Sequence, residues 1–144
     1  MTTHTFDDHN IRWQKLGDFE HFTYYLFDVN IPLKTVDFIV KFDPNQSIFL
    51  HRHRALTHTF VLQGEHRLYE PDGGLKEVRP VGSYTASPAG EPHREGGGAE
   101  GAVVVYSIRG EAGVLFEVLD DDFNIVGTLG LEDFAQLLAQ QNSL

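Results

Sequence analysis

Cysteine is absent from the 144 residues of this chain, and basic residues are few. The lack of cysteine excludes disulfide scaffolds, thiol nucleophiles and cysteine-based zinc or iron–sulfur sites. The chain has 11 Lys and Arg residues against 21 Asp and Glu residues, which gives a formal net charge of −10. A chain this acidic repels phosphate backbones and anionic lipid surfaces, so we expect neither nucleic acid nor a membrane as its partner.

Long apolar segments are also missing. No run approaches the roughly 20 residues that a helix needs to cross a bilayer. The first ten residues, MTTHTFDDHN, are polar and acidic, unlike a signal or transit peptide. We therefore expect a cytoplasmic protein with a flexible arm at 1–10 and a single domain at 11–144.

Short apolar runs of period two dominate the rest of the sequence. In the segment 36–42, apolar residues recur at every second position, which predicts a strand with one apolar face. By the same reasoning, strands are expected at 19–29, 47–53, 57–63, 66–70, 75–79, 83–87, 102–108 and 114–119. Turn sequences such as Pro71-Asp72-Gly73-Gly74 and Ala112-Gly113 separate them. This pattern predicts an all-β sandwich or barrel, and helical spacing of leucine and phenylalanine predicts one amphipathic helix at 131–141.

Three of the eight histidines have the spacing of a metal site. His51 and His53 are two residues apart in a predicted strand, so both side chains point to the same face. His93 follows a turn shaped by Pro88 and Gly90, and the intervening strands can bring it back to the first pair. Neutral imidazole suits iron, zinc, nickel, copper and cobalt. The pattern predicts one metal ion held by these three histidines, the alternative being three polar strand residues that bind nothing.

The spacing around these histidines resembles the cupin family. The second cupin motif, G-x5-P-x-G-x2-H-x3-N, is matched by Gly82, Pro88, Gly90 and His93. The first motif, G-x5-H-x-H-x3–4-E-x6-G, is matched by His51, His53 and Gly64. Asn45 replaces the leading Gly of the first motif, the Glu of that motif is absent, and Gly97 replaces the final Asn of the second. The resemblance implies an antiparallel jelly-roll β-barrel (a cupin) with a short C-terminal helix.

The flanking segments resemble a narrower group, the small cupins that include acetylacetone-cleaving and dihydroxyacetophenone dioxygenases and the cupin domains of certain anti-sigma factors. The likeness is in Trp13-x2-Leu16-Gly17, residues 59–64, 113–118 and 120–127. It implies one divalent metal per chain, iron(II) favoured and zinc or nickel possible, and a small diketone or hydroxyketone cleaved with O2. It also implies a homodimer or homotetramer. A non-catalytic sensing module and a non-redox isomerase or lyase remain alternatives.

Glu70 is a candidate for the missing carboxylate ligand. If Gly64 lies at a hairpin turn, positions 58 and 70 face each other across the hairpin, and the dihydroxyacetophenone-cleaving relatives carry a Glu at about this place. A surface glutamate is the alternative. His58 could also be a fourth ligand, a ligand-orienting residue or a surface residue. Glu91 and Glu95 flank His93 and could orient its ring, although surface charge is the simpler interpretation.

An apolar substrate pocket is expected beside the metal. The candidate walls are Phe49, Phe60, Leu62 and Tyr84. Tyr106 and Arg109, near the end of a predicted strand, are candidates for substrate contact, with core or rim positions as the alternative. The remaining histidines have no partner at a useful spacing and are expected to be surface or structural residues: His4, His9, His21 and His66.

Overall fold

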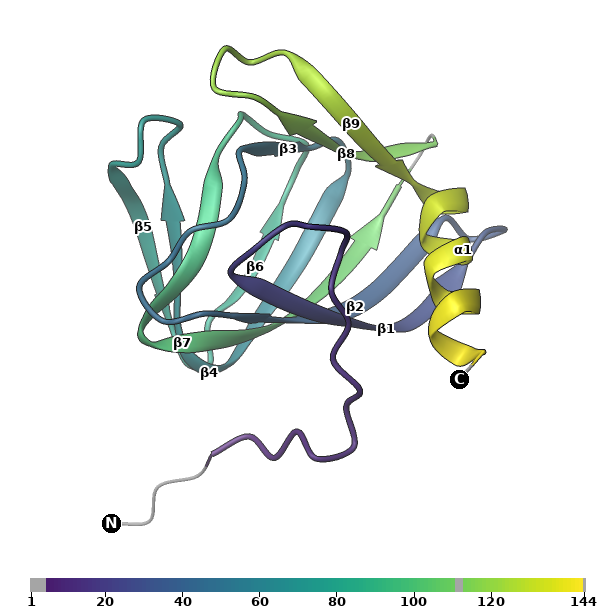
Figure 1. The fold of residues 1–144 in the computed structure, drawn as a ribbon, viewed down its shortest axis with the longest axis horizontal. Helices are drawn as coiled ribbons and strands as arrows, with labels where there is room; N and C mark the ends of the chain where they lie inside the picture. Colours follow the sequence, from purple (N-terminus) through teal and green to yellow (C-terminus); the bar gives the residue numbers. More distant parts are fainter. Residues whose placement is uncertain (1–4, 111–112, 144) are drawn as a thin grey trace.

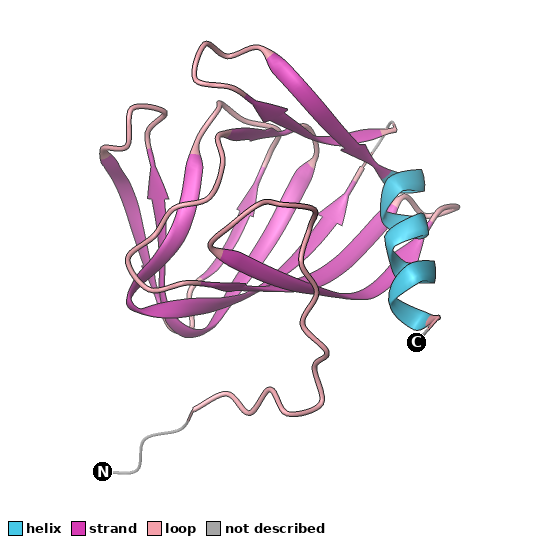
Figure 2. Cartoon of the chain, viewed as in Figure 1, coloured by secondary structure: helices cyan, strands magenta, loops and turns pink. Residues whose placement is uncertain are grey.

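Two antiparallel β-sheets face each other in a computed structural model that describes residues 5–110 and 113–143 (Figure 1). The larger sheet contains β1 (Phe22–Asn30), β2 (Thr35–Phe42), β4 (Leu56–Tyr69), β5 (Leu75–Pro80), β6 (Tyr84–Ser87) and β7 (Arg94–Arg109). The smaller sheet contains β3 (His51–His53), β8 (Val114–Leu119) and β9 (Ile125–Gly130). The described residues contain one helix, α1 (Leu131–Asn142), which follows β9 directly (Figure 2).

The strand order confirms the predicted all-β fold, an antiparallel jelly-roll barrel with one C-terminal helix. The larger sheet has the order β1-β2-β7-β4-β5, with β6 also paired to β4, and the smaller sheet has the order β3-β8-β9. The first and third strands begin later than expected, at residues 22 and 51, and three larger differences follow. The strands expected at 57–63 and 66–70 are one strand, β7 begins at residue 94 rather than 102, and β9 is additional. The turn expected at Ala112-Gly113 lies partly outside the described residues.

Gly64 explains why β4 is a single strand. Its φ of +74° lies in the left-handed region, which glycine adopts without a steric cost. A Cβ atom at this position would lie 2.1 Å from the backbone oxygen of Gly101 on β7, so only glycine allows this close approach. The pairing of β4 with β7 shifts on both sides of Gly64, which is a β-bulge and not a turn. The expected hairpin at Gly64 is therefore wrong.

The bulge reverses which side chains of β4 face the core. Before it, the buried residues are Thr57, Thr59 and Val61, and after it they are His66 and Leu68. In a regular strand, a side chain five positions after a buried one points to the opposite face. The extra residue in the bulge therefore turns His66 into the barrel.

The helix α1 closes one end of the barrel, beside β1 (Figure 1). Phe134 stacks on Phe38 of β2, with 5.8 Å between ring centroids. The Gln141 side chain accepts a hydrogen bond from the backbone N–H of Leu26 (3.0 Å) and donates one to its backbone oxygen (2.9 Å). The helix thus satisfies backbone groups at the free edge of β1 and covers the core at the same time.

Residues 5–10, the described part of the expected N-terminal arm, contain no helix or strand. The backbone N–H of Phe6 donates to Gln63 Oε1 (2.9 Å), and Asp8 pairs with Lys41 (3.1 Å). Residues 1–4, including His4, lie outside the described residues. Among the described residues, no helix has the length and the apolar character to cross a membrane.

Candidate metal centre

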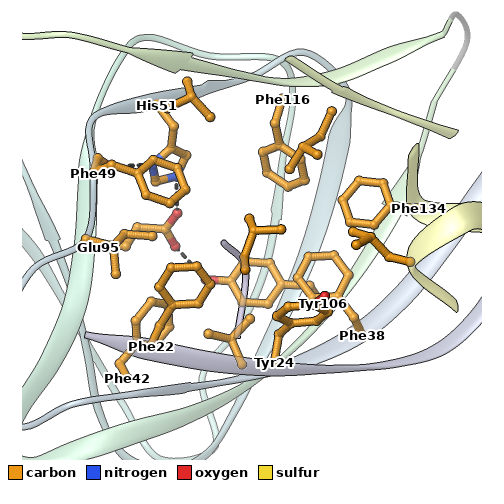
Figure 3. Close-up of a pocket in the computed structure, with 16 residues that line it drawn as sticks. Phe22, Tyr24, Phe38, Phe42, Phe49, His51, Glu95, Tyr106, Phe116 and Phe134 are labelled. Carbon is orange, nitrogen blue, oxygen red and sulfur yellow. Dashed lines mark hydrogen bonds and ion pairs between the residues drawn. The ribbon is translucent and has the colours of Figure 1, made fainter. Parts of the chain in front are cut away.

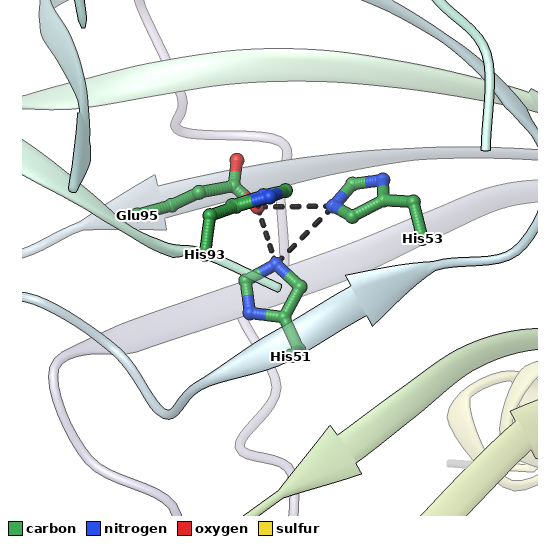
Figure 4. Close-up of side chains that lie close together, drawn as sticks. All are labelled: His51, His53, His93 and Glu95. Atoms are coloured by element: carbon green, nitrogen blue, oxygen red, sulfur yellow. Dashed lines mark hydrogen bonds and ion pairs between the residues drawn. The ribbon is translucent and has the colours of Figure 1, made fainter. Parts of the chain in front are cut away.

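Backbone hydrogen bonds bring the distant histidines together. His51 and His53 form the two ends of β3, and His93 lies directly before β7. The backbone N–H of His51 donates to the backbone oxygen of His93 (3.0 Å), and the reverse bond is 2.9 Å. A bridge between the two segments therefore places His93 opposite His51, with all three rings directed to one point (Figure 4).

A buried carboxylate completes this cluster. Glu95 Oε2 lies 2.6 Å from His51 Nε2 and 3.2 Å from the Nε2 atoms of His53 and His93. One ligand atom from each of the four residues lies within 4.8 Å of the others. Donor atoms about 2.0–2.2 Å from one metal ion are about 3 Å apart at neighbouring positions. The three nitrogens and one oxygen therefore fit a single divalent ion, and this donor set is compatible with iron, zinc or nickel.

The second nitrogen of each histidine ring is held by an acceptor, which orients the ring. The acceptors are the backbone oxygen of Phe49 for His51 (2.9 Å), Thr57 Oγ1 for His53 (3.1 Å) and the backbone oxygen of Glu91 for His93 (3.2 Å). A carbonyl oxygen only accepts, so Nδ1 carries the hydrogen in His51 and His93. In the neutral form of these two rings, Nε2 then offers its lone pair to a metal, as in many protein metal sites.

Burial and charge shift the pKa values of the side chains in the cluster. Burial lowers the pKa of His53 to about 4, so this ring is neutral at pH 7. Burial favours a higher pKa for Glu95, but the hydrogen bonds from its histidine neighbours outweigh it and hold the pKa well below the usual value. Burial favours a lower pKa for His93, but its hydrogen bond to Glu95 raises it overall. A neutral imidazole and an ionised carboxylate are the forms that bind metal.

The second oxygen of Glu95 is occupied by two further buried side chains. The Tyr106 hydroxyl donates to Oε1 (2.6 Å), and His66 Nε2 lies 2.8 Å from the same atom. Both side chains are almost fully buried. Of the two roles expected for His66, surface or structural, the structural one agrees with its burial, and His66 also contacts Glu95 directly.

Glu70 and His58 do not join the cluster. Glu70 is exposed at the end of β4, where its backbone N–H donates to the oxygen of Gly74 in a tight turn (2.7 Å). His58 lies on the outer side of β4, and its ring contacts the Tyr84 hydroxyl. Glu70 stays outside because the chain does not turn back at Gly64 and positions 58 and 70 are not cross-strand partners. His58 stays outside because it lies between the inward-facing Thr57 and Thr59.

The carboxylate in the cluster has a sequence signal that we interpreted differently. Glu95 follows His93 by two residues, as His53 follows His51. Residues two apart on a strand share a face. His93 is expected on a new strand after the turn at Pro88 and Gly90, but the interpretation of Glu95 as an orienting or surface residue did not use the face that this strand gives to both residues.

An apolar cavity of about 80 Å³ reaches the cluster from inside the barrel (Figure 3). Its walls are mainly aromatic and aliphatic, and His51 and Glu95 are its polar contacts with the cluster. Two of the candidate pocket residues, Phe49 and Tyr106, line it. The other four do not.

The remaining candidates lie outside the cavity because of strand alternation. The outer face of β4 carries Phe60 and Leu62, and Phe60 pairs in register with Tyr84 of β6. Phe60 is 40% exposed and Tyr84 is 61% exposed. Arg109 is exposed at the end of β7. The inner positions of this part of β4 are the odd-numbered ones, so the even-numbered residues face outward.

A second cavity of about 280 Å³, with more polar walls than the first, reaches the cluster through His53, His93 and Glu95. Its other walls include Thr57, Thr59, Lys76, Arg79 and Ser87. Glu95 is the one member of the cluster that lines both cavities. The cluster therefore lies between an apolar cavity and one with more polar walls.

Comparisons with known proteins show which fold this is. No protein-family model matches the chain, and no curated protein matches it. Among solved structures, an RmlC-like cupin from Ralstonia eutropha JMP134 has a TM-score of 0.75 and 17% identity over 98% of this chain and 87% of that one.

Two structures described as acetylacetone dioxygenases are also similar. The enzyme from Acinetobacter johnsonii has a TM-score of 0.75 and 12% identity over 97% of this chain and 93% of that one. A putative acetylacetone dioxygenase from Methylibium petroleiphilum PM1 has a TM-score of 0.73 and 15% identity over 96% of each chain. Together with the motif spacing and the strand order, these likenesses show that the chain has the cupin jelly-roll fold.

Proposed function

We propose that this protein is a metal-dependent dioxygenase that cleaves a carbon–carbon bond in a small diketone or hydroxyketone. The observation that carries the proposal is the convergence of four donor atoms, three imidazole nitrogens and one carboxylate oxygen, at the wall of an apolar cavity. The fold that it shares with two acetylacetone dioxygenases supports the same reaction class.

The charge of the site selects the substrate class. Three neutral imidazoles and one carboxylate leave a divalent ion with one net positive charge, which favours an anion such as the enolate of a β-diketone. An iron(II) ion in this cluster would supply Lewis acidity toward enolate oxygens and exchange electrons with O2. Phe49, Phe116 and Tyr106 would surround the hydrocarbon part of the substrate and exclude water.

The size of the apolar cavity limits what it can hold. A cavity of about 150 Å³ in another protein binds benzene, so the space of about 80 Å³ here fits a short alkyl group rather than a ring. The rest of the substrate would extend toward the larger, more polar cavity, whose walls include Lys76 and the ion pair of Arg79 with Glu77. We therefore expect small aliphatic diketones to be better substrates than aryl diketones.

The test begins with elemental analysis of protein purified without a histidine tag. The metal-free protein is then loaded with iron(II) without oxygen, and O2 uptake is measured against a panel of small diketones and hydroxyketones. We expect one O2 consumed for each substrate cleaved, with one oxygen atom from ¹⁸O2 in each fragment. The His93→Ala variant is the control for free iron. Full iron loading without O2 uptake on any member of the panel would reject this proposal.

A second candidate is a non-redox isomerase or lyase. Four protein donors leave an octahedral ion two positions, which suffice for a chelating substrate but leave none for O2 beside it. In that case proton transfer at the carbon between the two carbonyls would be the reaction. Substrate conversion, or deuterium exchange at that carbon, by the zinc- or nickel-loaded protein without oxygen would favour this candidate over the dioxygenase.

A further inference from the structure

The two oxygens of Glu95 have different environments. Oε2 faces the three histidines of the cluster (Figure 4), whereas Oε1 points toward Tyr106 (Figure 3). His66 contacts the same Oε1 atom. The Tyr106 hydroxyl donates to Oε1 at 2.6 Å, and His66 Nε2 lies at 2.8 Å. A carboxylate oxygen has two lone pairs for such bonds. The two neighbours therefore occupy the full hydrogen-bonding capacity of Oε1.

His66 is set up as the donor in its contact with Oε1. Its ring is 0% exposed, and its Nδ1 atom is buried without a hydrogen-bond partner. A buried N–H without an acceptor is more costly than a bare lone pair that lacks a donor, so the hydrogen belongs on Nε2. His66 then donates through Nε2 to Glu95.

Both donors are held in place by stacked rings. Phe42 stacks on His66, with 5.4 Å between centroids and an interplanar angle of 15°. Phe38 stacks on Tyr106, with 5.0 Å and 1°. Buried aromatic side chains packed in this way cannot turn aside without opening a cavity, so Oε1 stays occupied.

We propose that His66 and Tyr106 are positioning residues that keep Glu95 a monodentate metal ligand. The inference rests on metal binding at the cluster, which is part of the proposed function. A carboxylate binds metals through one oxygen or through both. If Oε1 turned toward the ion, it would take a fifth position and leave an octahedral ion only one. With Oε1 occupied, two positions remain, which is the number that a chelating diketone or hydroxyketone requires.

Mn²⁺ is the probe for the test, because the relaxation of water protons reports how many waters the bound ion holds. We expect two waters on wild-type protein and one on each of Tyr106→Phe and His66→Leu, in which Oε1 loses one of its two donors and gains a free lone pair for the ion. His66→Gln restores an N–H donor at a similar position and should return the count to two. Loss of an orienting partner typically weakens metal binding about 10–100-fold, and we expect this weakening for the two disruptive variants.

Tyr24→Phe is the matched control. Tyr24 lines the same apolar cavity, and the substitution removes the same hydroxyl group, but its side chain has no hydrogen bond with Glu95 among the described contacts. The water count should not change in this variant. Two bound waters in every variant, whatever the affinity or thermal stability, would overturn the inference and leave the metal site standing. Failure of wild-type protein to bind either Mn²⁺ or Fe²⁺ would overturn the proposed function and the inference together.

Discussion

At the scale of single residues, one carboxylate determines the charge of the cluster. Glu95 is 3% exposed, and both of its oxygens are hydrogen-bonded to buried side chains. Glu70, by contrast, is exposed next to a turn. Substitution of Glu95 is therefore expected to weaken metal binding and substitution of Glu70 is not, because only Glu95 presents an oxygen to the three histidines.

We expect Glu95→Gln to weaken metal binding by at least about 10–100-fold, the usual range for loss of such a partner. Glutamine keeps the shape of the side chain but removes the negative charge, so packing is not confounded with ligation. Glu70→Gln is the matched control and should bind within about twofold of wild type, since exposed substitutions usually change stability by no more than about 0.5 kcal/mol. Titration of one metal into the metal-free proteins at one pH measures both. A large effect at Glu70 with none at Glu95 would reverse the assignment.

At the scale of elements, the bulge in β4 determines that His66 points toward the metal cluster. Gly64 permits the close approach of β4 to its neighbour β7, and the bulge at this place turns His66 inward to Glu95. Bulges often re-aim a side chain near an active site. The geometry of the cluster therefore depends on a glycine that has no chemistry of its own.

Gly64→Ala should destabilise the protein by more than about 3 kcal/mol, because the new Cβ adds a backbone clash to the strain of a positive φ. Gly17→Ala is the control. Gly17 also has a positive φ of +52°, but a Cβ there would meet no atom within 4 Å, so its cost should be only about 1–2 kcal/mol. Urea unfolding of the metal-free variants measures both values. Equal losses of unfolding free energy at the two positions would show that the backbone of Gly101 does not restrict position 64.

One polar side chain of α1, Gln141, joins the helix to the edge of β1. Gln141→Ala removes both hydrogen bonds to the backbone of Leu26 and leaves two buried polar groups without partners. At about 1–3 kcal/mol for each group, we expect a loss of at least about 2 kcal/mol. Gln140→Ala, one residue earlier and exposed, should change little. Thermal unfolding distinguishes them, and equal melting temperatures would show that the helix docks through its apolar contacts alone.

At the scale of the whole molecule, the cluster connects the two sheets. His51 and His53 belong to β3 of the smaller sheet, whereas Glu95 belongs to β7 of the larger one. An ion held by all of them would cross-link the sheets at a place where β3 contributes only three residues. Metal binding should therefore be coupled to the stability of the entire barrel.

Metal should raise the unfolding free energy of the wild-type protein by about 2.7 kcal/mol when its free concentration is 100 times the dissociation constant. A chelator should remove this gain, and His93→Ala should show none of it. Thermal unfolding with and without the metal checks the prediction. Equal shifts in wild type and in His93→Ala would point to binding elsewhere. Sedimentation equilibrium on the same samples checks the expected homodimer or homotetramer.

Local sequence patterns were enough to predict most of the architecture. Alternating apolar residues predicted the strands, leucine and phenylalanine spacing predicted α1 to within one residue, and the His51-x-His53 pair placed two imidazoles on one face. These features could be predicted because each depends on side-chain periodicity within one element. The cupin resemblance added the third histidine by its spacing from a Pro-x-Gly turn.

The contacts around Glu95 were decided by the tertiary structure. His66 faces the cluster because of a bulge in β4. At this bulge Gly64 lies against the backbone of Gly101, which is distant in the sequence. Tyr106 and Glu95 lie on the same strand, β7, at positions 106 and 95, and their side chains meet only because this strand does not run straight. A two-residue period predicts a shared face only while the strand stays regular. One inserted residue reverses the face of every position after it, and only pairing with the neighbouring strand determines where that residue is accommodated.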